Sequence, residues 1–113
     1  MHEMSIVQSI LEVVNDEAQR NGLSRVVSVK LKLGEMSGAA PASLLFCWEL
    51  IVGDGPAAGA RLEIEPVLLK ARCRKCQAEF SPHDYVFICP ACGSNRVEVA
   101  QGQEITVSSI EGD

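Results

Sequence analysis

The first hydrophobic pattern recurs at helical spacing. Within residues 5–21 the apolar positions lie three or four residues apart and are Val7, Ile10, Leu11, Val14 and Ala18. Polar side chains occupy most of the intervening positions, which is typical of a helix with one buried face. Gly22 follows directly, and glycine commonly ends a helix because it tolerates a left-handed backbone. The pattern predicts an amphipathic helix over residues 5–21.

The next segments predict a strand, a helix and a second strand. Apolar and polar residues alternate strictly over 27–33, with Val27, Val29, Leu31 and Leu33 on the expected buried side. Pro41 suits a first helical turn, and helical spacing follows at Leu44, Leu45, Trp48, Ile51 and Val52. Residues 53–56 end that helix, and 61–65 alternate again. Pro66 limits how far the second strand can continue regular pairing unless this strand lies at a sheet edge.

Residues 71–95 have a different character. Periodicity disappears, and four cysteines occur together with Pro82, Pro90 and Gly93. So short a segment has too small an apolar core to fold without a metal ion. We expect an inserted lobe over 71–95 and a first unit made of 1–70 and 96–113. Residues 96–99 and 104–108 look like a hairpin that returns the chain to the first unit's sheet.

The cysteines form two C-x2-C pairs separated by twelve residues: Cys73, Cys76, Cys89 and Cys92. Four thiolates complete the tetrahedral shell of Zn²⁺, and a shell without an open position suits a structural site. Gly93 can supply the positive φ that the turn after a pair often requires. The alternatives are a redox dithiol, two disulfides or an iron–sulfur cluster. The paired spacing favours a zinc ribbon.

The remaining cysteine and an internal histidine have simpler interpretations. Cys47 lies on or beside the apolar face of the second helix, where cysteine behaves as a small buried hydrophobe. His83 could be a spare metal ligand, but four thiolates already fill a zinc shell, which favours an exposed loop histidine. The lobe's miniature core is expected to contain Phe80, Tyr85 and Phe87.

The amino terminus offers a second set of metal donors. The terminal amine of Met1 and the amide and imidazole of His2 can form fused chelate rings around Ni²⁺ or Cu²⁺. A further donor could come from the amide or carboxylate of Glu3, or from a partner protein. The alternative is an ordinary solvated chain end.

Composition and charge limit the function classes. The chain has 113 residues, is 47% hydrophobic and carries a net charge of -5, which opposes a broad phosphate-binding surface. No apolar run approaches the roughly 20 residues that span a bilayer, and the start does not resemble a signal peptide. We therefore expect a cytoplasmic protein without nucleic-acid or membrane partners. No nucleophile–base pair, phosphate loop or open metal shell indicates an enzyme.

Several sequence blocks occur in one order from the first residue to the last few. They are Met1–Ser5, Ser9–Ile10, Leu33–Gly38, Phe46–Glu49, Gly59–Ile64, Cys89–Ser94 and Ser109–Glu111. In these blocks the chain closely resembles the HypA/HybF family of hydrogenase nickel-incorporation proteins. Two small departures are Gln77, where a glycine often follows the first cysteine pair, and Cys47, where a small apolar residue is usual.

The resemblance implies an α+β fold, with a mixed three-stranded sheet packed against two helices and an inserted zinc-ribbon lobe. It implies a metallochaperone that binds Ni²⁺ through Met1, His2 and Glu3 and holds structural Zn²⁺ with the four cysteines. The implied partners are a nickel-loading GTPase and the [NiFe]-hydrogenase large-subunit precursor, with urease accessory proteins in some bacteria. The chain is expected to be a monomer or homodimer.

An alternative function comes from the basic residues beside the first cysteine pair, namely Arg72, Arg74 and Lys75. They are compatible with a zinc ribbon that binds nucleic acid through phosphate contacts. They are equally compatible with a solvated charged loop. The acidic chain as a whole opposes the nucleic-acid interpretation.

Overall fold

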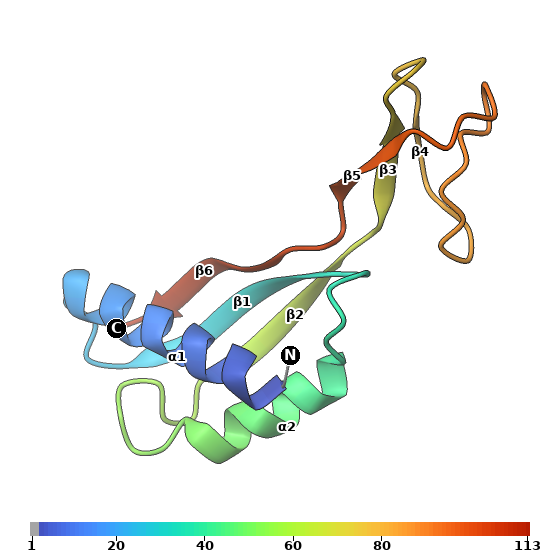
Figure 1. Ribbon diagram of the computed structural model, residues 1–113. Helices are drawn as coiled ribbons and strands as arrows, with labels where there is room; N and C mark the ends of the chain where they lie inside the picture. The colour runs from blue at the N-terminus through green and yellow to red at the C-terminus, as the bar shows by residue number, and fades with distance from the viewer. Residues whose placement is uncertain (1–2) are drawn as a thin grey trace.

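The computed structural model describes residues 3–113 and contains two helices and two three-stranded sheets (Figure 1). The helices are α1 (Glu3–Arg20) and α2 (Pro41–Ile51). The first sheet has the order β2-β1-β6, and the second has the order β4-β3-β5. The strands are β1 (Val26–Gly34), β2 (Arg61–Val67), β3 (Lys70–Cys73), β4 (Glu79–Phe80), β5 (Val97–Gln101) and β6 (Ile105–Gly112).

The first sheet is mixed, because its central strand β1 is parallel to β2 and antiparallel to β6. Helices α1 and α2 pack against each other and cover one face of this sheet (Figure 1). Their buried side chains form a single apolar core with the strands, and its largest fully buried members include Leu31, Leu44, Val7, Val14, Val26 and Val29. This architecture confirms the predicted α+β fold class.

The sequence pattern explains how each helix is placed. Helix α1 buries the predicted stripe except for Leu11, which is half-buried, and Gly22 adopts a φ of 66° just after the helix. Helix α2 begins at Pro41 as predicted. Its buried Trp48 donates a hydrogen bond from Nε1 to the carbonyl of Ala60 at 2.9 Å. This bond fixes α2 to the residue that precedes β2.

The predicted alternation in β1 is wrong at its first residues. The pairing of β1 with β6 shifts between Val26 and Ser28, so one residue, Val27, is left over in β1. Such a bulge turns the following side chains by one position relative to regular pairing. Val26 and Ser28 are therefore buried, and Val27 is only half-buried.

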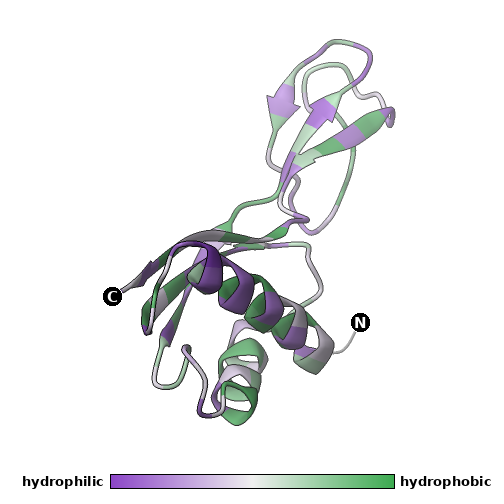
Figure 2. Cartoon of the chain, turned by 90° about the vertical axis from the view of Figure 1, so that its left-hand side faces the viewer, coloured by the Kyte–Doolittle hydropathy of each residue, from purple (hydrophilic) through white to green (hydrophobic). Residues whose placement is uncertain are grey.

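The expected hairpin of residues 96–99 and 104–108 does not form. Strand β5 pairs with β3 in the second sheet, and only β6 returns to the first sheet. The chain leaves the first sheet after β2 and returns to it only at β6. The outgoing strand β3 and the returning strand β5 lie side by side and pair with each other. The molecule is elongated, with extents of 54 × 25 × 16 Å (Figure 2). Its radius of gyration of 17.4 Å exceeds the about 13 Å of a compact chain of this length.

Three segments meet where the two sheets are connected, and we call them the interlobe joint: 34–36, 67–69 and 102–104. The amide of Gly34 donates to the Glu104 carbonyl, and that of Met36 donates to the Gly102 carbonyl, both at 2.7 Å. The Glu35 carboxylate accepts the Leu69 N–H at 2.9 Å. These bonds tie both crossing segments to the end of β1.

A carboxylate also stabilises the returning segment of the joint. Glu104 accepts the Gly102 N–H through Oε1 at 2.6 Å. Hydrogen bonds from the backbone N–H groups of Glu104 and Gly102 lower the pKa of this carboxyl group. The ionised form of Glu104 is therefore the one that the joint favours.

Neither described helix is long and apolar enough to cross a membrane.

Replacement of Gly102 by alanine is expected to destabilise the protein by about 2–4 kcal/mol. Gly102 has a φ of 107°, and a Cβ atom there would lie 2.6 Å from the Leu69 Cα. Urea unfolding followed by the fluorescence of Trp48 measures the change. The matched control is Gly55→Ala, because a Cβ at Gly55 meets nothing within 4 Å. Equal stability of the two variants would contradict a tightly packed joint.

Candidate metal centre

The second sheet and its loops bring the four paired cysteines together. Their Sγ atoms all lie within 4.8 Å of one another. Cys73 Sγ is 3.6 Å from Cys92 Sγ, and Cys76 Sγ is 3.5 Å from Cys89 Sγ. A disulfide bond is about 2.05 Å long, whereas four sulfurs at about 2.3 Å from a tetrahedral zinc ion lie about 3.8 Å apart. The sulfur positions are therefore compatible with one zinc ion.

The two cysteine pairs have the same backbone arrangement. In the first pair, the Gln77 N–H donates to the Cys73 carbonyl at 2.9 Å; in the second, the Gly93 N–H donates to the Cys89 carbonyl at 2.8 Å. Gln77 and Gly93 both adopt a left-handed backbone, with φ values of 68° and 74°. The predicted positive φ of Gly93 is confirmed. Gln77 adopts the same conformation without the freedom of glycine.

Backbone amides stabilise the thiolate form of Cys73. The N–H groups of Cys76 and Lys75 point at its Sγ from 3.5 and 3.4 Å, and they lower the pKa of Cys73 to about 6. The Ala78 N–H has the same effect on Cys76, but the contacts of its thiol with the other cysteines and the loss of surrounding water outweigh that bond and raise the pKa of Cys76 to about 11. Four adjacent sulfurs cannot all be ionised without a cation, and a divalent metal ion supplies it.

The interior of the second lobe contains few apolar side chains. Its most deeply buried residues are Ala71, Cys73 and Cys89. The expected miniature core is wrong for Tyr85, which is 56% exposed, while Phe80 and Phe87 are half-buried. The loop around Tyr85 has positive φ values and turns its side chain outward. The cysteines themselves form the centre of this lobe.

Among the described residues, the four-sulfur cluster contains none of the other candidate ligands. His83 is exposed in the loop between the two pairs, as the simpler interpretation predicted. Cys47 packs against the core of the first lobe but is half-buried rather than buried. Met1 and His2 lie outside the described residues, and Glu3 is the first residue of α1.

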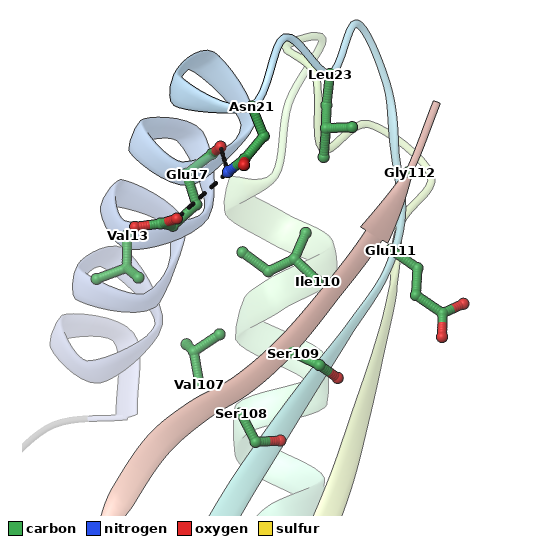
Figure 3. A pocket seen from close by; sticks show the side chains of 10 residues that line it. All are labelled: Val13, Glu17, Asn21, Leu23, Val107, Ser108, Ser109, Ile110, Glu111 and Gly112. Carbon is green, nitrogen blue, oxygen red and sulfur yellow. Dashed lines mark hydrogen bonds between the residues drawn. The ribbon is translucent and has the colours of Figure 1, made fainter.

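The structure contains other surface features that the sequence did not indicate. A hollow between α1 and β6 is lined by residues such as Val13, Glu17 and Val107 (Figure 3). The carboxylates of Glu35 and Glu104 in the interlobe joint also escaped prediction. Glu35 lies 34 residues before its partner Leu69, so no local pattern reveals the bond.

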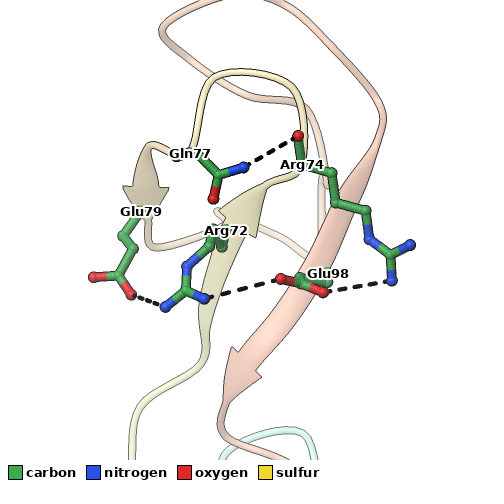
Figure 4. Close-up of polar contacts among 5 residues, drawn as sticks. All are labelled: Arg72, Arg74, Gln77, Glu79 and Glu98. Carbon is green, nitrogen blue, oxygen red and sulfur yellow. Dashed lines mark hydrogen bonds and ion pairs between the residues drawn. The ribbon is translucent and has the colours of Figure 1, made fainter.

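The basic residues beside the first cysteine pair are mostly engaged in ion pairs. Arg72 contacts Glu79 at 3.0 Å and Glu98 at 4.0 Å, and Arg74 contacts Glu98 at 3.4 Å (Figure 4). All four side chains are partly exposed, so each pair stabilises the lobe only slightly. The pairs nevertheless neutralise two of the three cationic side chains that the sequence placed here.

The fold and the four-thiol cluster define a small two-lobed metal-binding protein. The family described as hydrogenase/urease nickel incorporation, metallochaperone, HypA, matches residues 1–112. The hydrogenase maturation factor HypA of Geotalea uraniireducens is 44% identical over 111 residues, covering 98% of both chains. The hydrogenase maturation factor HybF of Morganella morganii is 31% identical over 113 residues and the full length of both.

Solved structures show the same fold. A solution structure of a HypA protein has a TM-score of 0.78 at 25% identity, covering 99% of this chain and 96% of that one. The solution structure of the Ni metallochaperone HypA from Helicobacter pylori has a TM-score of 0.74 at 24% identity, covering 99% and 97%. The chain belongs to the HypA family of nickel metallochaperones and hydrogenase maturation factors.

Replacement of Gln77 by glycine is expected to stabilise the metal-bound lobe by about 1 kcal/mol, because a left-handed non-glycine residue costs roughly that much. The exposed hydrogen bond from Gln77 Nε2 to the Arg74 carbonyl, at 3.3 Å, is the only contact this change removes from the described hydrogen bonds. Gly93→Ala, at the equivalent position, is expected to weaken metal binding. Competition with a chelator measures the metal affinity of both variants. The affinity should rise in Gln77→Gly and fall in Gly93→Ala, and a change of the same sign in both would contradict the prediction.

Removal of the metal ion is expected to unfold the second lobe alone. Its buried set is small, whereas the first lobe has a continuous apolar core. In a ¹⁵N NMR spectrum, chelation should collapse the dispersed signals of residues 71–95 and preserve those of α1 and β1. If the signals of residues 71–95 stayed dispersed after chelation, the second lobe would not depend on metal for its fold.

Proposed function

We propose that the protein carries Ni²⁺ to the [NiFe]-hydrogenase large-subunit precursor during enzyme maturation. The observation that supports this most is the family match over residues 1–112, which includes the amino terminus. The relatives with the same coverage bear the name hydrogenase maturation factor. The proposed activity is transport rather than catalysis.

The proposed nickel ligands are the terminal amine of Met1, the amide and imidazole of His2, and the amide of Glu3. Nitrogen donors in a plane suit Ni²⁺. Glu3 is the first residue of α1. Amides in the first turn of a helix have no intrahelical acceptor, so its nitrogen is available without breaking helical bonds.

The proposed zinc ligands are Cys73, Cys76, Cys89 and Cys92. Four thiolates give a closed shell, which suits a permanent structural ion better than a transported one. Cargo and structural metal then occupy separate sites, the first at the amino terminus and the second in the other lobe. Each site can be loaded without displacing the ion in the other.

We propose a nickel-loading GTPase as the partner in delivery, and the cytoplasm as the location. The family description also names urease, which makes urease accessory proteins a second set of proposed partners. The protein would act as a monomer or homodimer. It requires no nucleic acid or membrane for this function.

The sequence suggested a nickel-binding unit of residues 1–70 and 96–113 and a zinc-ribbon unit of 71–95. Because β5 pairs with β3, we further propose that the zinc unit is wider and extends to about residues 70 and 101. The nucleic-acid alternative has less support, because Arg72 and Arg74 are engaged by Glu79 and Glu98.

Replacement of His2 by alanine is expected to abolish stoichiometric nickel binding, because it removes the imidazole from the terminal chelate. Isothermal calorimetry with Ni²⁺ measures the loss. Metal analysis should show an unchanged zinc content, since all four cysteines remain. Nickel bound at one equivalent by the variant would disprove the amino-terminal site.

Acetylation of the Met1 amine provides a second test with every native side chain present. The acetyl group removes the terminal amine as a donor and should weaken nickel binding strongly, while zinc content stays the same. The matched control is His83→Ala, which removes an exposed imidazole from the other lobe. It should leave nickel binding unchanged.

A further inference from the structure

The two edges of the first sheet differ in how they are protected. Strand β2 forms one edge and carries Arg61, Glu63, Glu65 and Pro66, all exposed. Charges and proline are the usual devices that prevent another strand from pairing with an edge. Strand β6 forms the other edge, and its residues 105–110 contain neither charge nor proline. Only the β6 edge is left chemically open to strand addition.

The start of β6 directs backbone groups away from the sheet. The Gly34 N–H donates to the Glu104 carbonyl, so these two residues form a hydrogen-bonded pair. Bonded and non-bonded pairs alternate along an antiparallel ladder. Thr106 is therefore bonded to Lys32, its partner in the register. The N–H and C=O groups of Ile105 and Val107 consequently point outward.

A groove runs beside this open edge, between β6 and α1. One half, of about 690 Å³, lies against the start of both elements and is mostly apolar, with Ile6, Ile10 and Ile105 among its walls. The other half, of about 630 Å³, contains Glu17 and Asn21 (Figure 3). Val13 and Val107 line both halves, so the groove is continuous.

The charges along the groove have one sign. Glu17 on α1 is the charged side chain that faces the groove among the described lining residues, and no lysine or arginine lines it. Glu111 on β6 also borders the groove, but its carboxylate points away from α1 (Figure 3). Arg20 contacts Glu17 at 3.3 Å, but this pair is largely exposed and water weakens it. The groove is therefore apolar at one end and acidic at the other.

We infer that this groove binds an extended segment of another protein as a fourth strand beside β6. The segment has apolar side chains at alternate positions, which enter the apolar half, and a basic side chain that reaches Glu17. Backbone bonds to Ile105 and Val107 provide affinity, and the side chains provide selectivity, as in other cases of strand addition.

The structure opposes a second copy of this chain as the occupant. In β6 the pairing shifts between Lys30 and Leu31, which leaves Ser108 as a bulged residue and limits the regular open edge to 105–107. A second β6 would also bring Glu111, an acidic residue, to a groove whose charged residues are acidic already. A basic segment from a different protein matches the charge better.

Two synthetic hexapeptides test the inference in the metal-loaded full-length protein. They are acetyl-Val-Thr-Val-Thr-Val-Arg-amide and acetyl-Arg-Val-Thr-Val-Thr-Val-amide, which cover both strand directions, and each has a matched version with Glu in place of Arg. ¹⁵N NMR titration should shift the amide signals of Ile105 and Val107. An Arg peptide should bind about fivefold more weakly to Glu17→Lys, because one ion pair is lost.

The matched control is Glu12→Lys, which makes the same charge change on an exposed residue of α1 outside the groove. It should leave the affinity close to that of the native chain, and Glu17→Lys should favour the Glu peptide. Equal effects of the two variants, or no shifts at about 1 mM peptide, would overturn the inference. So would shifts at Ile105 and Val107 that grow with protein concentration alone, because they would identify a second copy as the occupant.

Discussion

The need of four adjacent sulfur atoms for one shared cation is the constraint on which the second lobe depends. Its buried residues are too few to hold three short strands together, and two of the most buried are themselves cysteines. A divalent ion balances two of the four thiolate charges and attracts all four sulfur atoms, so the two turns that carry them are fixed relative to each other. The metal ion and its four ligands then stabilise the sheet formed by β3, β4 and β5.

The first lobe is stabilised by an apolar core instead of a metal ion. Two helices and a mixed sheet bury a continuous apolar core, and Trp48 adds a hydrogen bond across it. The interlobe joint connects the apolar lobe to the cysteine-bearing lobe through backbone hydrogen bonds and the carboxylates of Glu35 and Glu104. Because Gly34 and Gly102 lie in contact there, neither position has room for a side chain.

Local patterns predicted both helices, strands β1 and β2 and the cysteine cluster, because each depends on residues close in sequence. Gly22 located the end of α1 and Pro41 the start of α2, whereas α1 begins at Glu3, before the predicted start at residue 5. The pairing of β5 was not predictable, since Val97–Gln101 alternates equally well for either sheet. The bulge at Val27 and the bond from Leu69 to Glu35 depend on distant partners. The proposed ligands Met1 and His2 come from chemistry and family likeness and stay predictions.

The elongated shape has a mechanical consequence. The second lobe extends away from the first, and both crossing segments pass through the same short joint. Because the cysteine cluster lies at the far end of this elongated shape, any rotation about the joint of Gly34, Gly102 and Leu69 displaces the cysteines much further than the residues beside the joint. The tight packing at Gly34 and Gly102 is therefore what fixes the position of the distant metal centre.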